Sequence, residues 1–200
     1  MTVLKLKPRR AAPDQASSVS PRLPLSISRA EFLIGGSDRE FRRLIHRMLI
    51  SAGRLDAIRE AIARRIGVTG TQYTMLMSVL HLQGATGISI GGLAEYLQVT
   101  GPHVTGVIGK LAALGLVRKT MNPRDRRGVL VRLTPVGRKR LIATFDFIRG
   151  VNDRLFDGVN RDEYRVLANF NAKFIGTTQA TLDWIDRQSP ARERVKMVEF

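Results

Sequence analysis

Three arginines gather around one acid in a short run near the middle of the chain: Arg124, Asp125, Arg126 and Arg127. The run lies in the segment 122–128, which has an Asn-Pro pair at its start and a glycine at its end, so it predicts the tip of a β-hairpin. A guanidinium group is planar and weakly hydrated, which suits the narrow, electronegative minor groove of duplex DNA. These residues could therefore bind a groove of duplex DNA or its phosphate groups. A solvated basic loop with no ligand is the alternative.

A helix with one bare face is predicted just upstream, between Thr100 and Gly115. Thr100 is a good N-cap, and Pro102 is tolerated in the first turn because its missing N–H needs no partner there. The apolar residues follow a 3.6-residue period and define a buried side: Val104, Val107, Ile108, Leu111 and Leu114. The other side carries small or polar residues that a major groove can admit: Pro102, His103, Thr105, Gly106, Gly109 and Lys110. Taken alone, this helix is equally explained as an ordinary core helix with a solvated face.

The neighbouring segments favour the DNA-binding interpretation. A shorter helix with Ser89 as its N-cap precedes, and the three-residue connection 98–100 has the length of the turn in a helix-turn-helix. Two segments rich in branched residues, 116–121 and 129–133, follow as predicted strands on either side of the arginine-rich tip. The region 69–134 is therefore predicted to be a winged helix-turn-helix in a mainly α (α+β) fold.

Four phrases occur in a specific order: Leu93-Ala94-Glu95, the run LAALGLVR at 111–118, Asp125-Arg126-Arg127, and the run VRLTPVG at 131–137. In this combination, from about Asp38 to Arg187, the chain resembles the MarR family of bacterial transcriptional regulators. The resemblance implies a homodimer that reads a pseudo-palindromic DNA site, with repression as the usual outcome. It also implies that Asp125 orients Arg127 for entry into the minor groove. The chain departs from the family pattern at Gly101, Gly106 and Gly109, so we expect less direct base readout.

The resemblance further implies a small anionic or aromatic effector, held between the dimer helices and the winged domain. Three residues are candidates to contact it: His46, Arg59 and Met75. Arg59 falls on the main apolar stripe of its helix, where a cation needs a partner, and an ion pair with a carboxylate is the alternative to an effector. His46 is equally explained as a packed or surface histidine, and Met75 as a core residue.

Capping signals and composition divide the rest of the chain. Residues 1–36 form a basic, proline-rich extension with one short helix predicted after Ser28. A capping-box pattern at 37–40 opens a long helix to residue 66, and caps at Thr134 and Asn160 open two helices within 135–188. Residues 189–200 are a predicted disordered tail. The apolar sides of the segments 37–66 and 135–188 exceed what a small winged domain can cover, so they are predicted to join two subunits.

The charge balance points to a polyanionic partner. The chain has 33 Lys and Arg residues and 17 Asp and Glu residues, which gives a net charge of +16 and a pI near 11.4. Such an excess favours nucleic acid over a membrane, particularly as no apolar run approaches the roughly 20 residues that span a bilayer. A low-specificity architectural protein that binds DNA or RNA is the second interpretation. With no cysteine and no apolar signal segment at the N-terminus, we expect a cytoplasmic protein without a thiol switch.

Sequence signals for catalysis are absent. The chain has three histidines and no cysteine, and it lacks a metalloprotease motif, a phosphate-binding glycine loop and a paired acid and base. We therefore expect no enzyme activity, no cofactor and no metal site.

Overall fold

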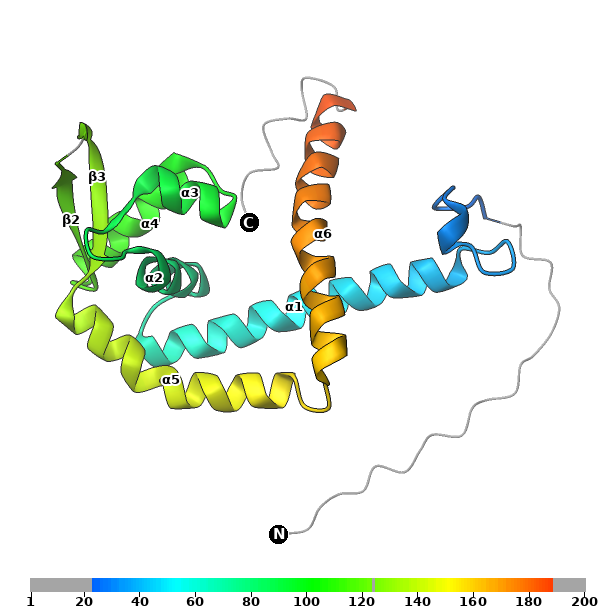
Figure 1. Ribbon diagram of the computed structural model, residues 1–200, viewed down its shortest axis with the longest axis horizontal. Helices are drawn as coiled ribbons and strands as arrows, with labels where there is room; N and C mark the ends of the chain where they lie inside the picture. Colours follow the sequence, from blue (N-terminus) through cyan, green and yellow to red (C-terminus); the bar gives the residue numbers. More distant parts are fainter. Residues whose placement is uncertain (1–22, 124, 189–200) are drawn as a thin grey trace, which may run out of the picture. The chain divides into compact units, whose positions relative to one another are not determined.

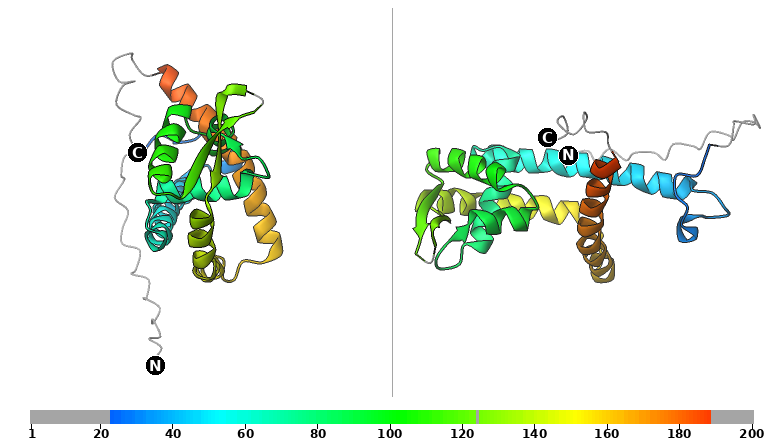
Figure 2. Two further views of the ribbon diagram at one scale, coloured as in Figure 1. Left: turned by 90° about the vertical axis from the view of Figure 1, so that its left-hand side faces the viewer. Right: turned by 90° about the horizontal axis from the view of Figure 1, so that it is seen from above.

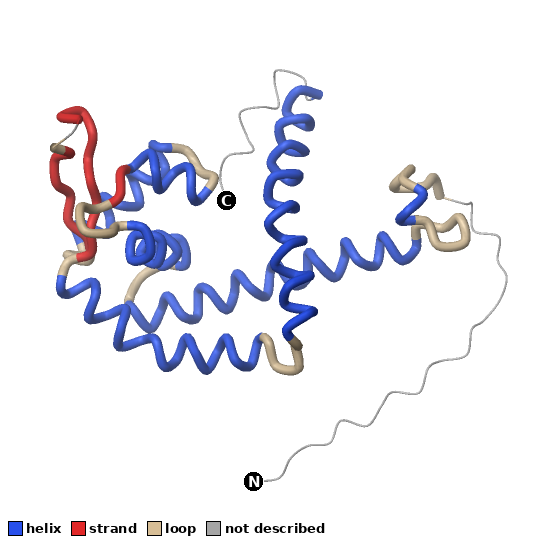
Figure 3. Tube along the Cα trace, in the orientation of Figure 1, coloured by secondary structure: helices blue, strands red, loops and turns tan. Residues whose placement is uncertain are grey.

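The computed structural model describes residues 23–123 and 125–188, and of residues 124–127 it describes no side chains. The chain divides into two compact units at Ile58 and Arg59. The described elements are mostly helices, with the strands confined to one small sheet (Figure 3). The prediction of a mainly α winged-helix fold is confirmed.

The first unit contains a 3-10 turn, η1 (Ala30–Phe32), and most of helix α1 (Arg39–Ile66). The predicted capping box at 37–40 is wrong, because its two acceptors are used differently. The Ser37 hydroxyl accepts from the Arg39 N–H at 3.3 Å, and Glu40 pairs with Arg43 at 3.0 Å. The Ser37 N–H donates to the Ile34 carbonyl oxygen instead of to Glu40. The helix predicted after Ser28 is reduced to the three residues of η1.

The second unit is built around three packed helices, α2 (Gly70–Leu82), α3 (Ile90–Leu97) and α4 (Gly101–Ala113) (Figure 1). The three helices pack around a buried core, and each of them contributes at least one large side chain to it. Its fully covered members include Leu76, Val79, Leu93, Val104, Ile108, Leu111 and Leu116. At the C-terminal end of α1, only Ile62, Ala63 and Ile66 are buried.

A three-stranded antiparallel sheet completes the winged unit, in the order β1-β3-β2. Strand β2 (Val117–Asn122) pairs with β3 (Asp125–Leu133) from Val117 opposite Leu133 to Met121 opposite Val129. Strand β1 (Ile88–Ser89) adds two residues on the other side of β3. Figure 2 shows the hairpin of β2 and β3 extending beyond the helices of this unit.

The structure corrects the predicted wing. The segment 122–128 was expected to be a loop, but strand pairing continues through it to Asn122 opposite Asp125, with a register shift after Met121. Consequently only Pro123 and Arg124 separate the strands. Strand β1 was not predicted, because two residues carry no periodicity.

Two helices close the described chain, α5 (Pro135–Leu155) and α6 (Arg161–Gln188). Their predicted caps are confirmed: the Thr134 hydroxyl accepts from the Gly137 N–H at 3.0 Å, and Asn160 and Glu163 bond reciprocally. Gly137 is required where α5 starts, because a Cβ atom there would overlap the Leu116 carbonyl oxygen. Helix α6 has no buried residue.

Candidate nucleic-acid interface

Helix α4 is buried on one side and open on the other. Val104, Ile108 and Leu111 are fully buried, and Val107 is 9% exposed. The face opposite them is exposed at the positions predicted for a DNA-facing surface, Pro102, His103, Thr105, Gly106 and Lys110, with Gly109 partly covered. Leu114 was expected on the buried side but is 46% exposed, because it follows the last residue of the helix and serves as its C-cap.

Both ends of α4 are set by local hydrogen bonds. The Thr100 hydroxyl accepts from the His103 N–H at 3.4 Å, as the sequence predicts. At the other end Gly115 takes a φ of +69°, which a residue with a side chain rarely adopts. The turn before the helix uses Gln98 in a left-handed conformation at φ 55°, while the Val99 N–H donates to the Ala94 carbonyl oxygen. These bonds fix which α4 residues face outward.

The glycines of α4 are not required by packing inside the chain. A Cβ atom built at Gly101, Gly106 or Gly109 meets no atom within 4 Å. Alanine is favoured over glycine in a helix interior by about 1 kcal/mol. The bare face of α4 therefore costs stability without any gain in the packing of this chain, and it leaves the helix backbone accessible to a ligand.

The wing carries the predicted basic residues, but their side chains are not described. The backbone places Asp125, Arg126 and Arg127 at the start of β3, and Arg124 lies outside the described residues. Two further basic residues were not singled out from the sequence: Arg118 and Lys119 on β2 are both exposed. Adjacent residues of a strand point to opposite faces of the sheet. The alternation of apolar and polar residues in the sequence could therefore have identified either Arg118 or Lys119 as a surface cation.

The positive charge of the chain is concentrated in the winged unit. Residues 59–145 hold thirteen Lys and Arg residues and three acids, which accounts for most of the net +16. An exposed helix face and a basic hairpin on the same unit form a surface suited to a polyanion.

A small cavity lies behind this surface. It has a volume of about 280 Å³ and is lined by Arg59, Thr71, Thr74, Met75, Leu97, Val99 and His103. The structure thus brings together two of the three predicted effector residues, Arg59 and Met75. His46 is exposed on α1 in the other unit and does not line the cavity. His103 belongs to both the cavity and the outer face of α4.

The described residues form neither a metal site nor a membrane-spanning helix. Among 23–123 and 125–188, no group of three or more His, Asp or Glu side chains is placed to hold a metal ion. Within the same ranges, no helix has both the length and the apolar character needed to cross a membrane.

Known proteins share this part of the chain. A family model described as MarR family matches residues 66–128. The transcriptional activatory protein BadR of Rhodopseudomonas palustris is 34% identical over 96 residues, covering 48% of this chain and 55% of BadR. The multiple antibiotic resistance protein MarR of Salmonella typhimurium is 33% identical over 72 residues, covering 36% of this chain and 48% of that protein. The chain thus spans about half the length of these curated relatives.

A solved structure extends the likeness beyond the winged unit. A mutant of MarR from E. coli, complexed with operator DNA, superposes with a TM-score of 0.57 at 25% sequence identity. The match covers 68% of this chain and 93% of that one.

We predict that Gly106→Ala and Gly109→Ala have opposite effects on folding and on DNA binding. Each should raise stability by about 1 kcal/mol, because alanine is the better helix former and the added methyl group meets open space. Each should also weaken binding to duplex DNA several-fold, because the methyl group would hold the helix away from the groove. Thermal unfolding and fluorescence anisotropy with labelled duplex measure the two effects.

The matched control is Gly53→Ala in α1, where a Cβ atom also meets nothing within 4 Å. It should change stability only. If all three variants bind DNA as the wild type does, close approach of the α4 backbone to DNA is excluded.

Proposed function

We propose that this chain is a transcriptional regulator of the MarR family that binds double-stranded DNA as a homodimer. The observation that carries the proposal is the one-sided burial of α4, which leaves small and polar residues outward on the most basic part of the chain. A helix of this kind can enter the major groove, because nothing bulky prevents its backbone from approaching the bases. A cytoplasmic location follows from this partner.

The apolar surface of the long helices supports a dimer. Helix α6 has 28 residues and none is buried. Eight large apolar or aromatic residues are exposed along it: Tyr164, Val166, Leu167, Phe170, Ile175, Leu182, Trp184 and Ile185. Exposed apolar surface on this scale marks an interaction site. A second copy of the chain would cover it and would present a second α4, about 34 Å away, to the next turn of the same duplex.

Base recognition is proposed to be shared between α4 and the wing. Thr100, Pro102, His103, Thr105, Gly106 and Lys110 would form the major-groove contacts, and few of them can make the bidentate hydrogen bonds that discriminate bases strongly. The wing, with Arg124, Arg126 and Arg127, would add minor-groove contacts that depend on local DNA shape. Asp125 would orient Arg127, as the family resemblance implies.

The direction of regulation depends on the position of the operator. A dimer bound across a promoter represses by occlusion, whereas the same dimer bound upstream can activate. We propose repression as the default outcome. The relative BadR is named an activatory protein, so in vitro transcription from a promoter that carries the selected site is the decisive measurement.

The cavity of Arg59, Met75 and His103 is the proposed effector site. Its volume of about 280 Å³ is near the lower bound for small-molecule pockets. A guanidinium beside apolar side chains suits a small aromatic anion. Because His103 lies on α4, a ligand in this cavity contacts the helix that meets DNA. A ligand shifts DNA affinity only if it binds one arrangement of α4 more tightly than the other.

A low-specificity architectural protein is the alternative, and the bare face of α4 is the observation that favours it. Such a protein would bind operator and random duplexes almost equally, and its affinity would fall with salt at a log-log slope of about −0.9 per neutralised phosphate.

We predict that selection from random duplexes recovers an inverted repeat with half-site centres about one helical turn apart, since two copies of α4 would meet one face of the duplex. Competition binding with the recovered site and a scrambled site at fixed salt gives the specificity ratio. Recovery of unrelated sequences, with a ratio near one, would establish the architectural alternative.

We predict that Arg127→Ala weakens operator binding by about 10- to 100-fold, the usual effect of losing a groove-binding arginine. Its dimer, measured by sedimentation, should be unchanged. Arg149→Ala on α5 removes an equal charge from an exposed helix position and serves as the control. Near-normal affinity of the Arg127 variant would remove the wing from the mechanism.

We predict that benzoate, a minimal aromatic anion, releases the wild-type protein from its operator and does not release Arg59→Met, which keeps an unbranched, flexible side chain but lacks the charge. The measurement is anisotropy of the operator complex during benzoate titration. Equal release of both proteins would exclude Arg59 from the effector site.

A further inference from the structure

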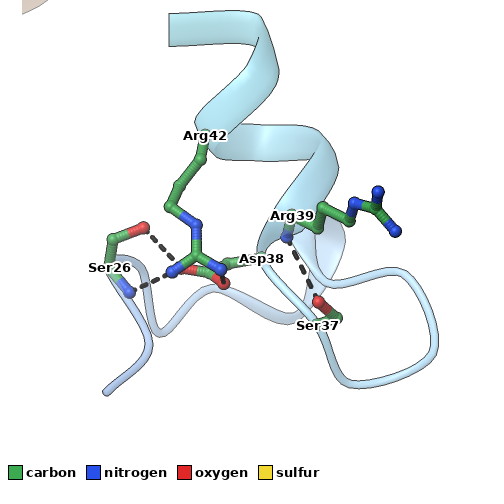
Figure 4. A network of polar contacts seen from close by, with 5 residues as sticks. All are labelled: Ser26, Ser37, Asp38, Arg39 and Arg42. Carbon is green, nitrogen blue, oxygen red and sulfur yellow. Dashed lines mark hydrogen bonds and ion pairs between the residues drawn. The ribbon is translucent and has the colours of Figure 1, made fainter. Parts of the chain in front are cut away.

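A buried carboxylate holds the segment before α1 in place. Asp38 is 2% exposed and accepts hydrogen bonds at Oδ2 from the Ser26 N–H (2.7 Å) and the Ser26 hydroxyl (2.5 Å). Its Oδ1 pairs with the Arg42 guanidinium at 3.0 Å. Figure 4 shows Ser26 and Arg42 converging on Asp38 at the start of the helix. The Ser26 hydrogen bonds hold the pKa of Asp38 below its ordinary value, so the carboxylate is charged at neutral pH.

Further contacts give the segment a defined shape. We call residues 23–37 the N-terminal hook. The ring of Phe32 packs on Phe41 of α1 with centroids 5.7 Å apart, and the Arg29 guanidinium lies 5.2 Å above Phe32. Ile34 and Ser37 exchange backbone hydrogen bonds at 3.0 and 3.1 Å. The hook is therefore a folded element.

The hook presents its aliphatic side chains to solvent. Leu23, Leu25 and Ile34 are 74%, 52% and 67% exposed. Ordering a chain segment costs conformational entropy. Because these side chains stay exposed, they contribute almost no stabilising free energy of burial within their own unit. Leu44, Ile45 and Leu49 on α1 are exposed as well. This many exposed apolar side chains in one unit mark an interaction surface.

We propose that the hook docks on a second copy of this chain and extends the subunit interface. The inference rests on the homodimer proposed above. Phe32 packs on Phe41, where the apolar side of α1 begins, so the hook prolongs a surface already assigned to the dimer. The matched family model covers residues 66–128 and does not include the hook.

Charge supports a second copy as the occupant. Residues 23–58 hold six arginines and four acids, whereas residues 146–188 hold seven acids and six basic residues. The latter segment is acidic within a chain of net charge +16, and it includes the uncovered apolar side of α6. The net charges of these two segments are +2 and −1, so two copies can associate through them without the charge repulsion expected for the rest of this basic chain. Duplex DNA would not select leucine and isoleucine side chains.

The first test is dimer dissociation of the full chain without DNA. Leu25→Asp together with Ile34→Asp should raise the dissociation constant at least about tenfold, measured by sedimentation equilibrium. Ser26→Ala, which removes the hydroxyl bond to Asp38 but keeps the backbone N–H bond and the apolar side chains of the hook, should raise it less. The control Tyr96→Asp adds a charge at a position of similar exposure, 57%, on α3, outside both segments predicted to join the subunits, and should leave it unchanged. Circular dichroism confirms that each variant is folded.

The second test uses the absence of cysteine from the chain. Ile34→Cys introduces the only thiol, and its rate of alkylation by maleimide should fall as protein concentration rises through the dimer range. Tyr96→Cys, on the exposed side of α3, should react at one rate throughout. A thiol at position 34 that reacts equally fast in monomer and dimer overturns the proposal, as does protection that appears only when DNA is added.

The outcomes separate this inference from the proposed function. A wild-type chain that stays monomeric at all concentrations overturns the homodimer itself. A wild-type dimer that binds its operator, with hook variants that dissociate no more readily, overturns only the role of the hook.

Discussion

Four side chains of α4 enter the winged core, and the packing of this one stripe decides which residues of the helix face outward. Val104, Ile108 and Leu111 are fully covered, and Val107 almost so. A helix held on one side by close packing cannot rotate without exposing these side chains, which would cost about 1.5–3 kcal/mol for each. The positions of His103, Thr105 and Lys110 on the outer face follow directly from that constraint.

The distribution of charge suits this surface to a polyanion. The winged unit carries most of the excess positive charge, and its described cations include Lys110 on α4 and Arg118 and Lys119 on β2. Like charges held close together oppose folding and association unless an anion neutralises them. Duplex DNA would neutralise these charges, because its phosphates are regularly spaced. The same surface would then attract DNA at long range and recognise its grooves on contact.

The long helices and the hook meet a different requirement. Within the chain, α6 and much of α1 cover little apolar surface. The hook nevertheless has a defined conformation, because the buried carboxylate of Asp38 has three donors and the loss of any one of them is destabilising. Polar bonds thus fix the shape of a segment whose apolar side chains remain available for a partner. The DNA-binding surface and the association surface are built by different forces.

Much of the winged unit could be predicted from the sequence, because the deciding interactions are local. Thr100, Thr134 and Asn160 act as caps for helices that begin within a residue or two of them, and the period of the apolar residues of α4 defines its buried side. The prediction of the buried residues of α4 was wrong at one position, near the end of the helix. Leu114 fits the period of α4, yet the helix ends before it.

Other features depended on tertiary structure alone. Strand β1 exists because Ile88 and Ser89 lie beside β3, and the hairpin extends to Asn122 because strand pairing outweighs the loop preference of Asn-Pro. Asp38 bonds to Ser26, which lies twelve residues earlier in the chain. One cavity brings Arg59 and Met75 together with His103. Both groupings join residues from separate segments. No periodicity records such contacts, since they arise only when the chain packs on itself.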